Sequence, residues 1–250
     1  MLIESLARQI HDAPLFEKTR LAAWGKASTA TCIDIARVYL ESHEAGTALS
    51  WLERISADET FQAHERDQLL LHIHGQLVNK EKQADVAWRI FRRHRCAESL
   101  QDLLTVIGQD KKDRVIIDEI QTIIAGPTLV LSDAAFLLEI EHFNEGERYL
   151  LDRTDQLNGD WYGALLPLAE IFEKQEQALA ATMVYRALLD SILRRAQTKT
   201  YHYGVRYLKK LDKLAPSVVD WRNFDNHAIY SEHLQEKHGR KASFWSRYRE

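Results

Sequence analysis

The amino-acid sequence predicts an all-α fold, arranged as a tetratricopeptide-like α-solenoid of stacked helical hairpins. Its 250 residues include only 10 Gly and 4 Pro, too few turn residues for sheet sandwiches, propellers or glycine-looped dinucleotide folds. Apolar residues follow the helical period along almost the whole chain, and strict alternation is almost absent. Because 45% of the residues are hydrophobic and the charge is nearly balanced, disorder is excluded.

Helices are predicted from this periodicity at 2–11, 15–25, 28–42, 45–55, 59–79, 82–93, 97–108, 112–125, 132–143, 145–154, 161–174, 177–197, 200–214 and 226–238. Two helix starts have the spacing of a capping box, one from Ser56 to Glu59 and one from Asn144 to Glu147. Glycine or proline marks turns at 125–127, 157–160 and 215–217. None of these breaks is long enough to be a disordered linker.

A recurring pattern of small and large residues predicts the solenoid. In tetratricopeptide hairpins a small residue is followed by an apolar residue three positions later, by a small residue at twelve and by an apolar residue at sixteen. The pattern occurs in two strong and two weak copies: Ala36, Tyr39, Ala48, Leu52; Ala169, Phe172, Ala181, Tyr185; Ala87, Ile90, Ser99, Leu103; and Ala135, Leu138, Glu147, Leu151.

The copies begin 51, 48 and 34 residues apart, so extra helices at 59–79 and 112–125 are expected between the earlier hairpins. We expect residues 1–250 to form a single continuous helical-repeat domain. A globular helical bundle is the alternative fold.

Charge is distributed unevenly along the chain. Residues 1–193 contain 20 Lys and Arg against 31 Asp and Glu, whereas residues 194–250 contain 13 against 6. The same C-terminal region holds 9 of the 23 aromatic residues. We therefore define 194–250 as a basic, aromatic capping segment. Its charge either attracts an acidic ligand, such as nucleic acid, or pairs with the acidic part of the chain.

The compartment is predicted from what the sequence lacks. Cys32 and Cys96 form no paired motif, so neither a disulfide framework nor a zinc site is expected. The first residues have no basic region followed by a long apolar stretch, and no uncharged apolar run approaches the length of a membrane span. We expect a cytoplasmic protein with no membrane partner.

The C-terminal region resembles a known group of proteins. The stretch 201–215 leads to His227, Tyr230 and Leu234, and the chain then reads His-Gly-Arg-Lys-Ala-Ser-Phe-Trp at 238–245. This is similar to an uncharacterised bacterial family of helical-repeat proteins that ends in a His-Gly-Arg-Lys-x-x-Phe-Trp signature. Some relatives carry a SWIM-type zinc finger, which this sequence lacks. The metal and nucleic-acid roles of that finger therefore do not carry over, and the resemblance implies no activity.

Motifs for catalysis are absent. There is no phosphate-binding loop, dinucleotide fingerprint, nucleophile elbow or His-Glu-x-x-His zinc motif. His72 and His74 point about 200° apart on a helix, so they do not share an ion. We expect no metal and no cofactor. A hydrolase that brings together His202, Tyr203 and His238 is the one enzymatic alternative.

A basic stripe is the main candidate binding site. If residues 177–214 form one unbroken helix, six side chains fall within an arc of about 80°: Arg195, Lys199, His202, Arg206, Lys209 and Lys213. Such a ridge neutralises phosphates or another anionic partner. Alternatively it is a solvated face, or it pairs with acidic residues such as Glu139, Glu141, Glu145 and Glu147. A kink at 197–200 would split it.

The segment at 238–245 extends the candidate site to Arg240, Lys241 and Trp245. Gly239 suits the end of a helix, and the two cations suit its negative end. Phe244 and Trp245 are expected to dock into an apolar groove as an end cap. In the alternative, the cations bind an anion while Trp245 stacks on a base.

The leading hypothesis is a non-enzymatic protein–protein interaction scaffold that uses a concave helical-repeat surface. The alternative is a nucleic-acid-binding accessory protein that acts through its basic C-terminal region. The sequence does not indicate the identity of the partner or the oligomeric state.

Overall fold

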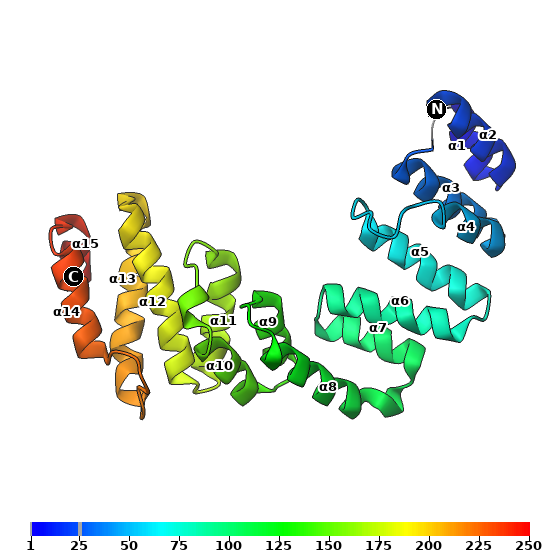
Figure 1. The fold of residues 1–250 in the computed structure, drawn as a ribbon. Helices are drawn as coiled ribbons and strands as arrows, with labels where there is room; N and C mark the ends of the chain where they lie inside the picture. Colours follow the sequence, from blue (N-terminus) through cyan, green and yellow to red (C-terminus); the bar gives the residue numbers. More distant parts are fainter. Residues whose placement is uncertain (1, 25–26) are drawn as a thin grey trace. The chain divides into compact units, whose positions relative to one another are not determined.

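The computed structural model describes residues 2–24 and 27–250, and within these ranges all regular secondary structure is helical. The chain divides into two compact units, Met1–Lys112 and Asp113–Glu250. The predicted all-α class is confirmed (Figure 1). None of the described helices is both long and apolar enough to cross a membrane.

The first unit contains seven α-helices among its described residues: α1 (Leu2–Gln9), α2 (Ala13–Trp24), α3 (Thr29–Glu41), α4 (Ala45–Leu52), α5 (Ala63–Gln76), α6 (Lys80–Arg93) and α7 (Ala97–Ile107). Helices next to each other in sequence pack together, and α3 also contacts α5. In the core, the carboxylate of Glu17 accepts hydrogen bonds from the Tyr39 hydroxyl (2.6 Å) and the Trp51 indole N–H (3.2 Å).

The second unit begins at Asp113 and therefore contains all of α8 (Lys112–Ala125) except its first residue. Its other helices are α9 (Leu131–Glu139), α10 (Phe143–Leu151), α11 (Tyr162–Lys174), α12 (Ala178–Arg195), α13 (Tyr201–Leu214), α14 (His227–His238) and α15 (Ala242–Arg249). Short 3₁₀ turns follow α10, α12 and α13. Helix α13 lies beside α12, and α15 packs on α13 (Figure 1).

Five helical hairpins share one turn geometry. Each has a three-residue linker whose middle residue has a positive φ, followed by an N–H that donates to the carbonyl five residues back at 2.8–2.9 Å. This is the Schellman arrangement, which satisfies carbonyls at the helix end. The middle residues are His11, His43, Val78, Glu141 and Glu176. Because none of them is glycine, the chain makes tight turns despite its low glycine content.

The turns correct the predicted spacing of the hairpins. Successive middle residues are 32, 35, 63 and 35 positions apart. The helix predicted at 59–79 is therefore not an extra helix between hairpins, because its observed counterpart α5 begins the hairpin α5–α6. The weak copy that starts at Ala87 lies instead on α6 and α7. Helix α7 begins with a capping box between Cys96 and Ser99.

Both strong copies of the small-residue pattern lie in the core of their hairpins. Ala36 and Ala48 are fully buried between α3 and α4, and Ala169 and Ala181 between α11 and α12. In α9–α10 the two small positions are each wrong by one residue, because Ala134 and Gly146 are buried whereas the predicted Ala135 and Glu147 are only half-buried. A Cβ at Gly146 would lie 3.0 Å from a methyl group of Leu138, so a small residue is needed there.

Neither predicted capping box forms. Ser56 lies in a turn before α5 and contacts Asp58, and Asn144 is already inside α10. The C-terminal segment is more regular than predicted, because residues 242–249 form α15. Phe244 is fully buried on α13, with its ring edge-on to Tyr201. The expected docking of this ring is observed.

Candidate functional site

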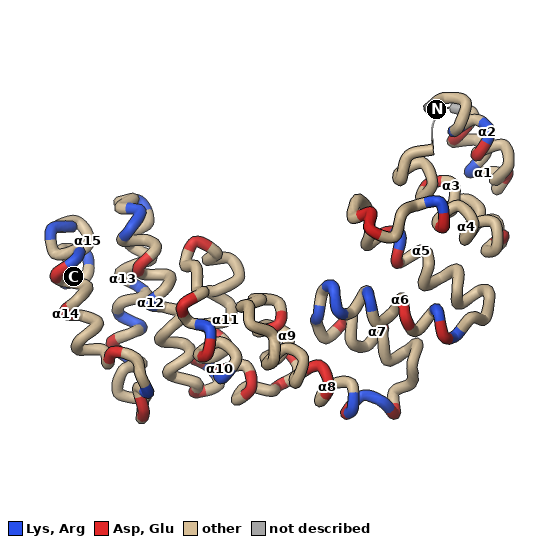
Figure 2. Tube along the Cα trace, in the orientation of Figure 1, with Lys and Arg blue, Asp and Glu red and all other residues tan. Residues whose placement is uncertain are grey.

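Four of the six residues of the predicted stripe lie together on α13. His202, Arg206, Lys209 and Lys213 are exposed and line a shallow groove of about 390 Å³. We call these four residues the basic face. Figure 2 marks its Lys and Arg positions along α13. Spacings of three and four residues place side chains on one side of a helix, so this part of the prediction agrees with the structure.

The other two residues of the stripe do not continue the basic face, because the helix is interrupted. Helix α12 ends at Arg195, and the following Ala196 has a left-handed backbone with φ 54°. Lys199 lies in the 3₁₀ turn before α13. The assumption of one unbroken helix over 177–214 is therefore wrong. Arg195 instead forms an ion pair with Asp160, 3.7 Å from the carboxylate oxygen.

The basic face is partly paired within the unit, but with other acids than those predicted. Arg206 lies 3.6 Å from the carboxylate of Glu170 on α11. One turn along, Lys210 forms a close ion pair with Glu173. Burial opposes the ionisation of Glu173, but hydrogen bonds from Lys210 and Tyr185 outweigh it and lower the pKa of Glu173. Helix α11, and not Glu139, Glu141, Glu145 or Glu147, thus supplies these partners.

The tail residues of the candidate site have different environments. Arg240 is exposed and Lys241 caps the start of α15. Trp245 is only 6% exposed, and its indole N–H donates to the carbonyl of His238 at 2.9 Å. Phe244 and Tyr248 both stand edge-on to its ring. This packing supports the end-cap interpretation of Trp245. The buried Trp245 ring is therefore not part of the binding surface.

An aromatic cleft lies beside the basic face, between α11, α12 and α13. It has a volume of about 470 Å³. Tyr162 and Tyr203 at its rim are 64% and 48% exposed. We name it by its main lining residues, which are Tyr162, Leu166, Ile192, Arg195, Tyr203 and Tyr207. The His202 and Tyr203 rings lie 3.9 Å apart, so the aromatic cleft and the basic face adjoin.

The aromatic cleft was not predicted from the sequence, apart from Arg195. Its walls come from three helices, and a spacing rule within one helix does not bring them together. Exposed aromatic residues were the available signal, since large exposed rings in a folded chain often mark contact surfaces. Trp161, 53% exposed and next to Tyr162 in the sequence, adds to this surface.

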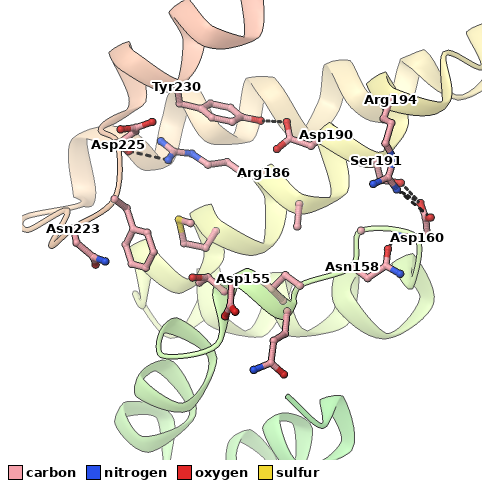
Figure 3. A pocket seen from close by; sticks show the side chains of 17 residues that line it. Asp155, Asn158, Asp160, Arg186, Asp190, Ser191, Arg194, Asn223, Asp225 and Tyr230 are labelled. Atoms are coloured by element: carbon pink, nitrogen blue, oxygen red, sulfur yellow. Dashed lines mark hydrogen bonds and ion pairs between the residues drawn. The ribbon is translucent and has the colours of Figure 1, made fainter. Parts of the chain in front are cut away.

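A second, polar cleft of about 780 Å³ lies on the other side of α12 (Figure 3). It is formed by residues 154–160, by α12 and by the segment before α14. Arg186 is 5% exposed, and its Nη1 donates to the carbonyl of Asp225 at 2.8 Å. Its guanidinium carbon lies 4.3 Å from the ring centre of Tyr230 and 5.0 Å from that of Trp221.

Ionisable groups in the polar cleft are shifted by their surroundings. The Tyr230 hydroxyl donates to the Asp190 carboxylate at 2.8 Å. Burial raises the pKa of Asp190, although Tyr230 and nearby cations oppose this shift. Burial also raises the pKa of Tyr230 and lowers that of Arg186. Shifted ionisable groups in a cleft are typical of functional sites.

Within the described ranges, no group of three His, Cys, Asp or Glu side chains is placed to hold a metal ion. The Nε2 atom of His227 is hydrogen-bonded to the Asp212 carboxylate at 2.8 Å. Of the hydrolase residues, His202 is exposed while His238 is buried.

Comparison with known proteins gives a family but no activity. Residues 3–247 match a family described as "Family of unknown function (DUF6880)". The chain belongs to this family. No curated protein and no solved structure matches it. DUF6880 membership agrees with the expected resemblance to an uncharacterised family. The terminal signature and the bacterial origin stay predictions.

Proposed function

We propose that the chain is a non-enzymatic protein–protein interaction scaffold. Its aromatic cleft holds apolar side chains of a partner segment, and the adjoining basic face binds acidic residues of the same segment. The observation that carries the proposal is the juxtaposition of exposed Tyr162 and Tyr203 with exposed cations on α13. The cytoplasmic location stays a prediction.

The residue types of the aromatic cleft suit protein recognition. Tyr, Trp and Arg are the side chains that most often dominate interface energies, and they act from central, well-packed pockets. Tyr162 and Tyr203 are about half exposed or more, so a partner gains by covering them. Full burial of one large apolar side chain contributes about 1.5–3 kcal/mol. Two rings therefore suffice for a micromolar contact only when charge attraction is added.

Charge complementarity selects an acidic partner. Lys209 and Lys213 form a cationic strip on the same helix as Tyr203 of the aromatic cleft, and α11 already neutralises Arg206 and Lys210. Such a strip attracts carboxylates and raises the rate of association. The partner segment is therefore one in which Asp or Glu residues flank aromatic or aliphatic ones.

We also propose the tetratricopeptide-like solenoid as the architecture that carries this surface. Five hairpins share one turn geometry, and three of the four intervals between them, at 32–35 residues, agree with a repeat of that class, whereas the fourth is 63 residues. Neighbouring hairpins contact each other through equivalent helices, as α9 does with α11 and α10 with α12. A single continuous domain and a concave binding surface stay part of this proposal.

Nucleic acid is the second candidate, and it draws on the same cations. The basic face and Arg240 would neutralise phosphates, and exposed Tyr203 offers a ring for stacking. The burial of Trp245 removes the ring first assigned to that role. Because two α13 cations are paired with α11, the protein partner is favoured.

The test uses two labelled peptide libraries and a labelled single-stranded oligonucleotide, with fluorescence polarisation on the full chain. In one library Glu alternates with Leu, Phe or Trp, and in the other Lys replaces Glu. We expect binding from the acidic library alone, with a loss of about tenfold or more in a Tyr162→Ser/Tyr203→Ser variant. Phe61→Ser is the matched control, since Phe61 is 59% exposed in the first unit.

Charge is tested with a Lys209→Gln/Lys213→Gln variant against Lys111→Gln/Lys112→Gln, two exposed lysines outside the surface. The Lys209→Gln/Lys213→Gln variant is expected to bind acidic peptides more weakly and with a smaller salt dependence. The Lys111→Gln/Lys112→Gln variant is expected to leave both the affinity and its salt dependence unchanged. Oligonucleotide binding that falls steeply with salt and is lost with Lys209 and Lys213 would support the second candidate instead. If neither acidic peptides nor the oligonucleotide bind, the proposed function is wrong.

A further inference from the structure

The polar cleft contains a buried cation whose hydrogen-bonding groups are not all used. Arg186 is 5% exposed, and only its Nη1 has a hydrogen-bond acceptor, the Asp225 carbonyl. Nε and Nη2 are buried and have no partner. A guanidinium N–H group without an acceptor in a buried position is costly. The structure thus holds two donors in place for an acceptor that the chain itself does not supply.

The two unused groups define the shape of that acceptor. Nε and Nη2 lie on the same edge of the planar guanidinium, and their N–H bonds point in parallel. This edge matches the two oxygens of a carboxylate, which forms a bidentate pair with it. The rings of Tyr230 and Trp221 lie over the guanidinium group and keep its plane fixed. A ligand therefore approaches the edge and not the face.

The other charges of the cleft exclude a purely anionic ligand. Arg186 and Arg194 line it together with four carboxylates, those of Asp155, Asp160, Asp190 and Asp225. Arg194 is already bonded to Asp160 at 3.1 Å. A phosphate dianion would be repelled by this acidic surround. A ligand that carries a cationic group beside its carboxylate is attracted to both.

Asp190 is placed to bind the cationic group. It follows Arg186 by one helical turn on α12, so the two side chains are neighbours on one side of the helix. Its carboxylate accepts one bond, from the Tyr230 hydroxyl, and retains further acceptor sites (Figure 3). It is also exposed to solvent at the cleft. An ammonium group bound to Asp190 is therefore close to a carboxylate on Arg186.

We propose that the polar cleft binds a small zwitterion, an amino acid or short peptide, with its carboxylate on the Nε–Nη2 edge of Arg186 and its ammonium group on Asp190. Because those two nitrogens have no accessible surface, binding requires a movement of the cleft wall. We assign that movement to the side chains of Asn223 and Phe224, which line the cleft. The polar cleft and the aromatic cleft take different residues of α12 and share only Gly159 among their lining residues.

The experiment measures ligand-induced thermal stabilisation and calorimetric binding with the full chain. The probes are the free L-amino acids, di- and trialanine, acetate, methylammonium and inorganic phosphate. We expect at least one amino acid or peptide to bind, and acetate, methylammonium and phosphate to bind about tenfold more weakly or not at all. The arms with free amino acids and with short peptides distinguish the two sources of the same chemistry.

Two variants test the assignment of the groups. Arg186→Lys keeps the charge but removes the bidentate edge, and Asp190→Asn keeps the shape but removes the charge that binds ammonium. Each is expected to weaken binding about tenfold or more. Arg114→Lys is the matched control, because this exposed arginine of α8 lines neither cleft and is not in the basic face; it is expected to bind as the parent does.

Three outcomes would overturn the proposal. The first is that no amino acid or peptide binds the parent chain at ligand concentrations up to about 10 mM. The second is that acetate binds as well as the best zwitterion. The third is that Asp190→Asn, whose fold is checked by circular dichroism, binds as tightly as the parent. If Arg186→Lys fails to fold, the Asp190→Asn result decides.

Discussion

Truncation of Phe244 tests how firmly the C-terminal segment is held. The ring is fully buried, and Gly204 on α13 lets it approach so closely that a Cβ there would lie 3.1 Å from a ring carbon of Phe244. Replacement of a buried Phe by Ala costs about 3–5 kcal/mol. Because α15 packs mainly on α13 and can detach from it, the cost is limited by its docking energy, and we expect about 3 kcal/mol for Phe244→Ala.

The assay is urea unfolding followed by circular dichroism, together with hydrogen exchange of the α13 and α15 amides. With a dependence of about 1–3 kcal/mol per molar urea, the midpoint of the affected transition should fall by about 1 M or more. Exchange in α15 should become fast well below that midpoint. Phe61→Ala, at an exposed ring, is the control and should change stability by about 0.5 kcal/mol at most. A Phe244→Ala effect as small as this control's would refute the cap.

Three further substitutions test buried polar groups. Arg153 is 7% exposed and donates to the carbonyls of Ile124 (2.7 Å) and Tyr149 (2.9 Å), so Arg153→Met should cost about 2–4 kcal/mol in urea unfolding. Asp67 is fully buried and accepts hydrogen bonds from two arginines of α6 at 2.6–3.0 Å, so Asp67→Asn should cost about 1–3 kcal/mol by the same measurement. Burial, then nearby lysines, lower the pKa of His238, so the unfolded chain binds its proton more readily and stability should fall as the pH drops below about 6.5. His238→Gln should flatten that pH profile.

Each of these expectations has a contrary result. An Arg153→Met chain as stable as the parent would mean that water satisfies the carbonyls at the end of α8. No loss in Asp67→Asn would mean that its two arginines need no carboxylate. Equal pH profiles of parent and His238→Gln would assign the acid sensitivity to other groups, among them His74, whose pKa burial also lowers.

Apolar periodicity predicted the helices well because their buried faces are continuous. It failed at α15, where Arg247 and Arg249 make the segment look like a basic loop and the helix depends on the tertiary burial of Phe244. The tight turns were also invisible in the sequence, because residues such as Val78 adopt a left-handed conformation that a β-branched side chain disfavours. In α9 two alanines are adjacent, and the structure fully buries Ala134 and not the predicted Ala135.

The candidate site was predicted only in part. The basic face on α13 follows from spacing within one helix, and all four of its residues were predicted in this way. A kink at 197–200 was the alternative considered for the stripe, and the observed break begins one residue earlier, at Ala196, where alanine as a strong helix former gives no signal. Tyr162 and Tyr203 come from different helices, and Arg186 on α12 finds its acceptor, Asp225, in the non-helical segment before α14. Such pairs depend on how the hairpins pack, and a spacing rule contains no information about that.

The most direct test of the proposed scaffold is to map a bound acidic peptide on the full chain by backbone amide NMR. The account predicts shift changes around Tyr162, Arg195 and Tyr203 and along the basic face of α13, and their loss in the Tyr162→Ser/Tyr203→Ser variant. Shift changes confined to the first unit or to the polar cleft, or an unchanged map in that variant, would contradict it.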